Sequence, residues 1–167
     1  MKPTRGVLAT GALCAGYSAF SLLLFLSGAP ARAVWLPIEP SAYYLAQAVF
    51  VWPLFALLTV VFTATVRATA NPSALGTFRE SYDALAQAYA WPLLLCFVIP
   101  DVVAFLIVGQ AGLAKAMRYY AWIAPLAIVA LSARYARTRF GVSTGRAALA
   151  SVAALFAQGA LGATVLR

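Results

Sequence analysis

The sequence predicts an all-α fold, a polytopic integral membrane bundle of about five transmembrane helices in a single domain, 1–167. Apolar residues make up 64% of the chain and charged residues only 10%, and the mean hydropathy is +0.89. A soluble globule of this length needs more polar surface than that. The apolar residues form runs of about 15 to 25, close to the ~20 residues that cross a ~30 Å hydrocarbon layer as a helix. The expected spans are 7–26, 42–66, 84–108, 119–133 and 147–166.

The basic residues predict how the bundle is oriented. The formal net charge is +8, and the lysines and arginines lie at the ends of the apolar runs. Cytoplasmic loops carry an excess of these residues. With a cytoplasmic N-terminus, eight basic side chains lie on the cytoplasmic side and four on the opposite side, which predicts N-in/C-out. The eight are Lys2, Arg5, Arg67, Arg79, Arg134, Arg137, Arg139 and Arg146, and the four are Arg32, Lys115, Arg118 and Arg167.

The first apolar run has two interpretations. Lys2 and Arg5, then an apolar run, then Ala-Arg-Ala at 31–33 resemble a secretory signal with a small-x-small cleavage site. The run is about 20 residues, however, whereas the apolar region of a signal usually has about 7 to 15. Gly11 and Ala15 lie four residues apart, a spacing that lets a second helix approach closely. We therefore expect a retained helix that packs through Gly11 and Ala15.

The next two spans follow segments rich in turn residues. Three prolines in 28–40 prevent a helix there and predict an ordered turn. Before the third span, Thr77 and Glu80 have the spacing of a capping box, which predicts that the helix begins at that point. Arg79 and Asp83 lie four residues apart in its first turns and are expected to pair weakly.

The second and third spans begin alike. The segments 41–48 and 81–88 share Ser, Leu, Ala, Gln and Ala in register, and Trp-Pro-Leu follows each. Successive spans run in opposite directions, so the likeness is either an inverted repeat of the kind found in transporters or a coincidence in an Ala- and Leu-rich sequence. Pro53, Pro92 and Pro125 would interrupt helices near the middle of the membrane.

Asp101 is the one carboxylate inside an expected span, with apolar neighbours on both sides. An ionised group at the bilayer centre costs on the order of 3 kcal/mol or more, so such residues usually have a partner or mark a pathway. We expect a structural role: a pair with Lys115 or Arg118, or a cap for a helix that restarts after Pro100. An ion or substrate role and a contact with another subunit remain as alternatives.

The segment before the last span is strongly basic. It holds four arginines and no acid in about 13 residues, and anionic headgroups attract such residues with about 1 kcal/mol each. We interpret it as a loop that anchors the protein to anionic membrane lipids, with an acidic protein partner or a specific lipid as the alternative. The four are Arg134, Arg137, Arg139 and Arg146.

The last span carries small residues at spacings of three and four. Helices in lipid associate through such close packing. This face is expected to pack on the bundle or on a separate protein subunit in a larger membrane complex. Its members are Ala150, Ala153, Ala157 and Ala160.

The inventory of reactive side chains is short. The chain has no histidine, four carboxylates, and two cysteines, Cys14 and Cys96, each alone in an apolar span. These residues cannot assemble a His-rich metal or haem site or a Ser-His-Asp triad. We expect no catalytic residue, no metal, no cofactor and no nucleic-acid partner, and hence no enzyme.

One segment resembles a known family. Residues 76–92, Gly-Thr-Phe-Arg-Glu-Ser-Tyr-Asp-Ala-Leu-Ala-Gln-Ala-Tyr-Ala-Trp-Pro, resemble the central signature of the Yip family, five-helix membrane proteins named for interaction with Ypt and Rab GTPases. The basic segment 137–148 resembles that family's turn before its last helix. The resemblance extends from about Glu39 to the C-terminus and implies a helical membrane domain that works by protein or lipid contact. The Ala- and Arg-rich composition suggests a divergent bacterial member.

These observations predict a non-enzymatic protein of the cell inner membrane that serves as an assembly, scaffold or accessory subunit through helix–helix and lipid contacts. The alternative is a small transporter or permease-like bundle that uses Asp101 and proline-broken helices. A buried polar cavity that reaches Asp101 would favour transport. A small-residue face covered by protein would favour assembly.

Overall fold

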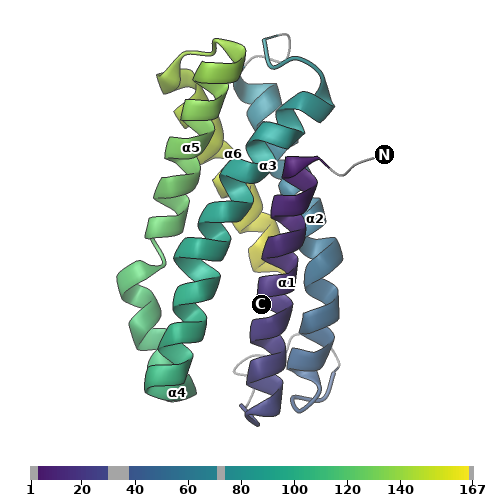
Figure 1. Cartoon of the computed structure of the whole chain (residues 1–167), viewed down its shortest axis with the longest axis vertical. Coiled ribbons are helices and arrows are strands. Elements are labelled where there is room, and N and C mark those ends of the chain that lie inside the picture. Colours follow the sequence, from purple (N-terminus) through teal and green to yellow (C-terminus); the bar gives the residue numbers. More distant parts are fainter. Residues whose placement is uncertain (1–3, 30–37, 71–73, 166–167) are drawn as a thin grey trace.

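The computed structural model describes residues 4–29, 38–70 and 74–165, with side chains described up to Gly159. These residues are all-helical: they form six α-helices and one π-helical segment, η1. Figure 1 shows the long helices side by side along one axis. The elements are α1 (Arg5–Leu26), α2 (Tyr43–Ala70), α3 (Phe78–Leu93), η1 (Leu94–Val98), α4 (Ile99–Tyr120), α5 (Ile123–Phe140) and α6 (Thr144–Val165).

The helices have the length and composition of membrane spans. Among the described residues, three helical segments are long and apolar enough to cross a membrane: Arg5–Leu26, Tyr43–Ala70 and Phe78–Phe140. Large apolar side chains also cover the outside of the bundle, among them Leu26, Ile107 and Phe156, which are about three-quarters exposed or more. Lipid tails suit such a surface and water does not.

The third of these segments is not one straight helix, because the chain reverses at Gly109. Its φ of 63° and ψ of −175° belong to a backbone region open essentially to glycine alone. The hydroxyl of Tyr120 contacts Asp101, although 19 residues of continuous helix would separate them by about 28 Å. In Figure 1, α4 descends to a turn and a second helical limb climbs back toward α5.

This reversal corrects the expected spacing of the third and fourth spans. The sequence predicts a loop at 109–118 and a short fourth span at 119–133, whereas the chain is helical through 110–120 and again through α5. The physical reason lies in the composition. Ala, Leu, Met, Lys and Arg of this segment are strong helix formers, so one glycine suffices for the turn.

Two prolines frame the π-helical segment. Pro92 lies inside α3 and Pro100 in the first turn of α4. A proline lacks the N–H that closes a helical turn, and π-bulges commonly relieve such gaps. In η1 the Ile99 N–H bonds to the Leu94 carbonyl, five residues back. The helix therefore continues, wider by one residue, immediately before Asp101.

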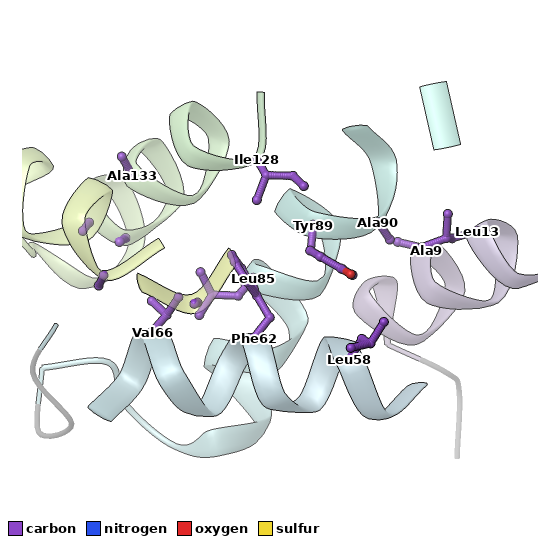
Figure 2. Packing of buried hydrophobic residues seen from close by; sticks show 14 of the residues in the cluster. Ala9, Leu13, Leu58, Phe62, Val66, Leu85, Tyr89, Ala90, Ile128 and Ala133 are labelled. Carbon is purple, nitrogen blue, oxygen red and sulfur yellow. The ribbon is translucent and has the colours of Figure 1, made fainter. Parts of the chain in front are cut away.

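Helix α3 lies at the centre of the bundle, in contact with α1, α2 and α5. Its Ala84, Leu85 and Ala90 are fully buried, and Tyr89 stacks on Phe62 of α2 with ring centroids 5.1 Å apart. Figure 2 shows Phe62, Leu85, Tyr89 and Ala90 between the helices. The alternation of small and large residues lets the helices approach closely in the absence of a hydrophobic drive.

Small and weakly polar residues join α1 to its neighbours. Cys14, Ser18 and Ser21 face α2, where their donors reach the Val51 carbonyl at 3.9 Å, the Ala48 carbonyl at 2.6 Å and the Gln47 side chain at 3.1 Å. In lipid such bonds contribute about 0.6 kcal/mol each and fix the register of the pair.

Helix α1 approaches α3 and η1 closely at other residues than those indicated by the sequence. A Cβ built on Gly6 would come within 2.9 Å of the Asp83 Cα, and one on Gly16 within 2.6 Å of Leu94. Gly11 has nothing within 4 Å of such an atom, and Ala15 is exposed. The expected packing of Gly11 and Ala15 within the chain is therefore wrong, because the opposite side of α1 faces the bundle.

The ends of α3 and α5 follow known capping rules. The capping box of Thr77 and Glu80 is present, which confirms the predicted start of the third helix. The basic segment, predicted as a loop, is instead mostly the last turns of α5. Gly141, at φ 68°, ends that helix, and α6 begins at Thr144. The prolines at 30 and 37 and the Asn-Pro dipeptide at 71–72 lie outside the described residues.

The reversal predicts opposite effects for one substitution at two glycines. Gly109→Ala should destabilise the protein by about 1–3 kcal/mol, because alanine is strained at that backbone angle. Gly11→Ala should stabilise it by about 0.5–1 kcal/mol, because Gly11 is helical and has space for a methyl group. Thermal unfolding in detergent measures both. Equal shifts for the two variants would contradict the assigned turn.

Candidate functional site

Asp101 is the most unusual buried residue of the bundle. Of the residues of α4, all of which the structure describes, it alone is buried, with 4% of its surface exposed. The Tyr120 hydroxyl, from the returning limb of α4, donates a hydrogen bond to its Oδ1. An apolar helix thus directs its one carboxylate inward, and the reversal at Gly109 supplies the donor.

The partner expected from the sequence is wrong. Lys115 and Arg118 are exposed, and no ion pair to Asp101 exists among the described residues. The residue is not a cap either, because Val98 holds the N-cap position without a side-chain bond and the chain enters α4 from η1 without interruption. Asp101 is therefore held by a neutral hydroxyl, and a basic group is absent from its described surroundings.

A cavity of about 410 Å³ opens beside Asp101. Three parts of the chain form its walls: the second half of α1, the start of α2, and the two limbs of α4 with η1. In Figure 1 these parts lie at the end of the bundle away from the N-terminus. The described lining residues are Tyr17, Phe20, Leu24, Tyr43, Tyr44, Gln47, Phe97, Asp101, Gln110, Leu113, Ala114 and Met117.

The polar groups of the cavity are held in fixed positions. Ser21 donates to the Gln47 Oε1 at 3.1 Å, and the Gln110 amide donates to the Tyr44 hydroxyl at 3.2 Å. The Tyr43 and Tyr44 rings meet edge to face at 5.4 Å. Hydrogen bonds and ring contacts therefore orient the walls, and Asp101 is the one charged residue among the described lining residues.

A second, wider cavity of about 810 Å³ lies at the opposite end. Here Asp83 accepts a hydrogen bond from the Gly6 N–H at 2.7 Å and pairs with Arg139 at 3.7 Å. Asp83 thus places a negative charge at the start of α1, where the helix dipole favours it. The lining residues are Thr4, Arg5, Thr77, Arg79, Glu80, Asp83, Arg139 and Phe140.

The contacts of this second cavity are structural. The expected Arg79–Asp83 pair is wrong, because Arg139 of α5 takes that place. Backbone and side-chain hydrogen bonds from Thr77 lower the pKa of the Glu80 carboxyl, which precedes the apolar part of its helix. Both carboxylates are therefore committed to helix starts.

Arg67 is a structural residue that sequence reasoning missed. It lies in the last turn of α2, and its guanidinium extends over the turn that precedes α3. There it donates to several carbonyl oxygens in place of backbone N–H groups. Its position in the last turn of a helix, next to a Gly-containing turn, is the signal that was available. Its Nη1 lies 3.2, 2.9 and 3.0 Å from the carbonyl oxygens of Leu75, Gly76 and Thr77, and 2.6 Å from the Ser81 hydroxyl.

The predicted headgroup anchors and the small-residue face lie on the outside. Arg134, Arg137, Arg139 and Arg146 are all exposed around the end of α5 and the start of α6. On α6, Ala150 is buried, Ala153 is exposed, Ala157 is half-buried, and the side chain of Ala160 is outside the described part. The bundle-facing side of α6 is a different one, made of Ala147, Ala150, Ser151, Ala154 and Gln158.

The remaining predictions of site chemistry concern metals and cysteines. No group of three or more possible metal ligands occurs among the described residues. Cys14 is buried and Cys96 half-buried, and both are free thiols. The Asp101 cavity is the site described above that brings one buried carboxylate together with hydrogen-bonded polar groups inside an apolar bundle.

No family model, curated protein or solved structure matches this chain. The resemblance to the Yip family stays a prediction, and the functional argument rests on the geometry of the bundle.

The Tyr120–Asp101 contact predicts unequal effects for two adjacent tyrosines. Tyr120→Phe should destabilise the protein by about 1–3 kcal/mol, because it removes the one described donor to a buried carboxylate. Tyr119→Phe is the control, since Tyr119 is 72% exposed and should change stability little. Unfolding midpoints in detergent measure the difference. A null effect at Tyr120 would contradict the contact.

Proposed function

We propose that this protein is a five-span, N-in/C-out protein of the cytoplasmic membrane that binds a small solute in the Asp101 cavity and acts without catalysis, as a permease-like bundle. The observation that carries the proposal is the cavity itself, because it lies inside an apolar helical protein, holds a few fixed polar groups and reaches a buried carboxylate. Intramembrane ionisable residues usually mark substrate or ion pathways. This geometry favours the transport alternative over the assembly role expected from the sequence.

The reversal at Gly109 supports the count of five spans. It divides the segment Phe78–Phe140 into two limbs that run in opposite directions, and α6 adds a further helix after the turn at Gly141. Asp83 and Arg139 meet at the start of α1, so the start of α3 and the end of α5 lie on the side of the N-terminus. The arginines at the end of α5 therefore lie on the same side as the N-terminus, which supports assigning that side to the cytoplasm.

The interrupted helices next to the cavity support a solute-binding role. Transporter sites commonly lie where membrane helices are broken, because freed backbone groups and altered geometry are tolerated only around a cavity. Here Pro92, η1, Pro100 and Gly109 follow one another along the wall that carries Asp101.

A second candidate function is assembly with another membrane subunit, and one observation favours it. An apolar groove of about 550 Å³ runs between α5 and α6 on the lipid-facing side, and Gly159 is among its lining residues. A partner helix would fit a groove with small residues at its edge. The groove is lined by Pro125, Leu126, Val129, Val152, Leu155, Phe156 and Gly159.

Assembly predicts a loss of association without unfolding. Ala153→Leu adds bulk on the exposed small-residue face of α6 but not inside the bundle, so the variant should fold normally and lose any co-purifying subunit. Ala154→Leu is the matched control, because Ala154 is fully buried and should cost about 1–3 kcal/mol by overpacking. Mild-detergent purification followed by size-exclusion chromatography measures both. An Ala153→Leu protein with unchanged associations would contradict the assembly candidate.

Thiol labelling tests the proposed function and the orientation together. In a background of Cys14→Ala and Cys96→Ala, a membrane-impermeant reagent should reach Met117→Cys, on the cavity wall, from outside the cell. It should reach Ser143→Cys, in the turn before α6, only after permeabilisation. Val103→Cys, on the lipid-facing side of α4, should stay unlabelled because the reagent needs water.

Each contrary result removes a different part of the proposal. Labelling of Met117→Cys and Ser143→Cys from one side would remove the five-span orientation. An unreactive Met117→Cys on both sides would show that the cavity is closed to water, and the permease-like function would be lost.

A further inference from the structure

We propose that the Asp101 cavity selects organic monocations, in which an ammonium group is attached to an apolar body. This inference rests on the proposed solute-binding function and adds the chemical class of the solute. It follows from three features of the walls: their charge, their aromatic content and their size.

The charge of the cavity favours a cation. Asp101 is the one charged residue among the described lining residues, and no lysine or arginine in the described part of the chain forms an ion pair with it. Tyr120 binds Oδ1 and leaves Oδ2 without a donor from the described residues. A buried carboxylate is stable only when paired and hydrogen-bonded. A bound cation would supply the missing partner, and an anionic solute would be repelled.

The aromatic residues of the walls suit an ammonium group that carries carbon substituents. Tyr17, Tyr43, Tyr44, Phe20 and Phe97 all line the cavity. The faces of such rings attract a cation within about 6 Å, and more strongly where water is excluded. Sites that combine several rings with one carboxylate recognise substituted ammonium ions, whose charge is spread over an apolar surface.

The remaining wall and the size of the cavity select for an apolar body. Leu24, Leu113 and Met117 also line the cavity and offer apolar surface. The volume of about 410 Å³ lies within the range of ~300–1,000 Å³ that is typical of small-molecule sites. A hydrated divalent metal ion fits poorly, because it needs several oxygen ligands and the described residues hold no cluster of three acidic or metal-binding side chains.

A matched pair of solutes tests this selectivity on the full-length protein in detergent. The probes are 3-phenylpropylammonium and 3-phenylpropan-1-ol, which share a carbon skeleton and differ in the charged group. Isothermal titration calorimetry should show binding of the ammonium compound at least tenfold tighter than that of the alcohol. Equal binding of the two would overturn cation selectivity and leave a solute site in place. Binding of neither would overturn the inference, and labelling of Met117→Cys would then decide separately whether the proposed cavity exists.

Two carboxylate-to-amide variants locate the site. Asp101→Asn keeps an oxygen for the Tyr120 hydroxyl and removes the charge, so it should weaken binding of the ammonium compound at least tenfold and leave binding of the alcohol within twofold. Glu39→Gln, at the same end of the bundle but exposed, should leave both affinities within twofold. An unchanged affinity in a folded Asp101→Asn protein would overturn the proposal. If that variant does not fold, the comparison of the two solutes on the unaltered protein still decides it.

Discussion

The reversal of the chain at Gly109 is the constraint on which the rest of the site depends. A membrane-spanning chain must satisfy its backbone polar groups internally, so a turn has to be brief and flanked by helix on both sides. Gly109 meets this requirement with one residue at a positive φ. The returning limb then brings Gln110 to Tyr44 and Tyr120 to Asp101, and these contacts close one wall of the cavity. Without the turn, Asp101 would have no described donor and would face lipid.

The two ends of the bundle use charge differently. At the N-terminal end, carboxylates and arginines are bound to backbone groups and to one another, as in the contacts of Arg67 and Asp83, and they hold helix ends together. At the other end, Asp101 lies in an aromatic cavity with a neutral hydroxyl as its partner. Paired charges at one end stabilise the fold, whereas the carboxylate at the other forms no ion pair with any described residue.

Much of the fold could be predicted from the sequence, and less of the site. Helical periods, apolar run lengths and the capping box of Thr77 and Glu80 are local properties, and the structure has helices in all five expected runs. The buried face of α6 could not be assigned, because alanine occurs on every side of that helix. Tyr120 could not be identified as the partner of Asp101, since the sequence predicts a loop at 109–118, whereas the chain turns at one glycine and is helical again through 110–120. The isolated carboxylate was visible in the sequence, but its cavity depends on contacts between distant segments.

The most direct test of this account is the distance across the turn. Spin labels at Ile99 and Ile123, both exposed, can be introduced into a protein that lacks Cys14 and Cys96 and measured by pulsed electron paramagnetic resonance in lipid. The reversal predicts a distance of roughly 20 Å or less, because the labelled positions lie on adjacent limbs whose axes are separated by about 8–10 Å. A continuous helix would place them about 36 Å apart. A distance near that larger value would contradict the turn at Gly109, and the Asp101 cavity with it.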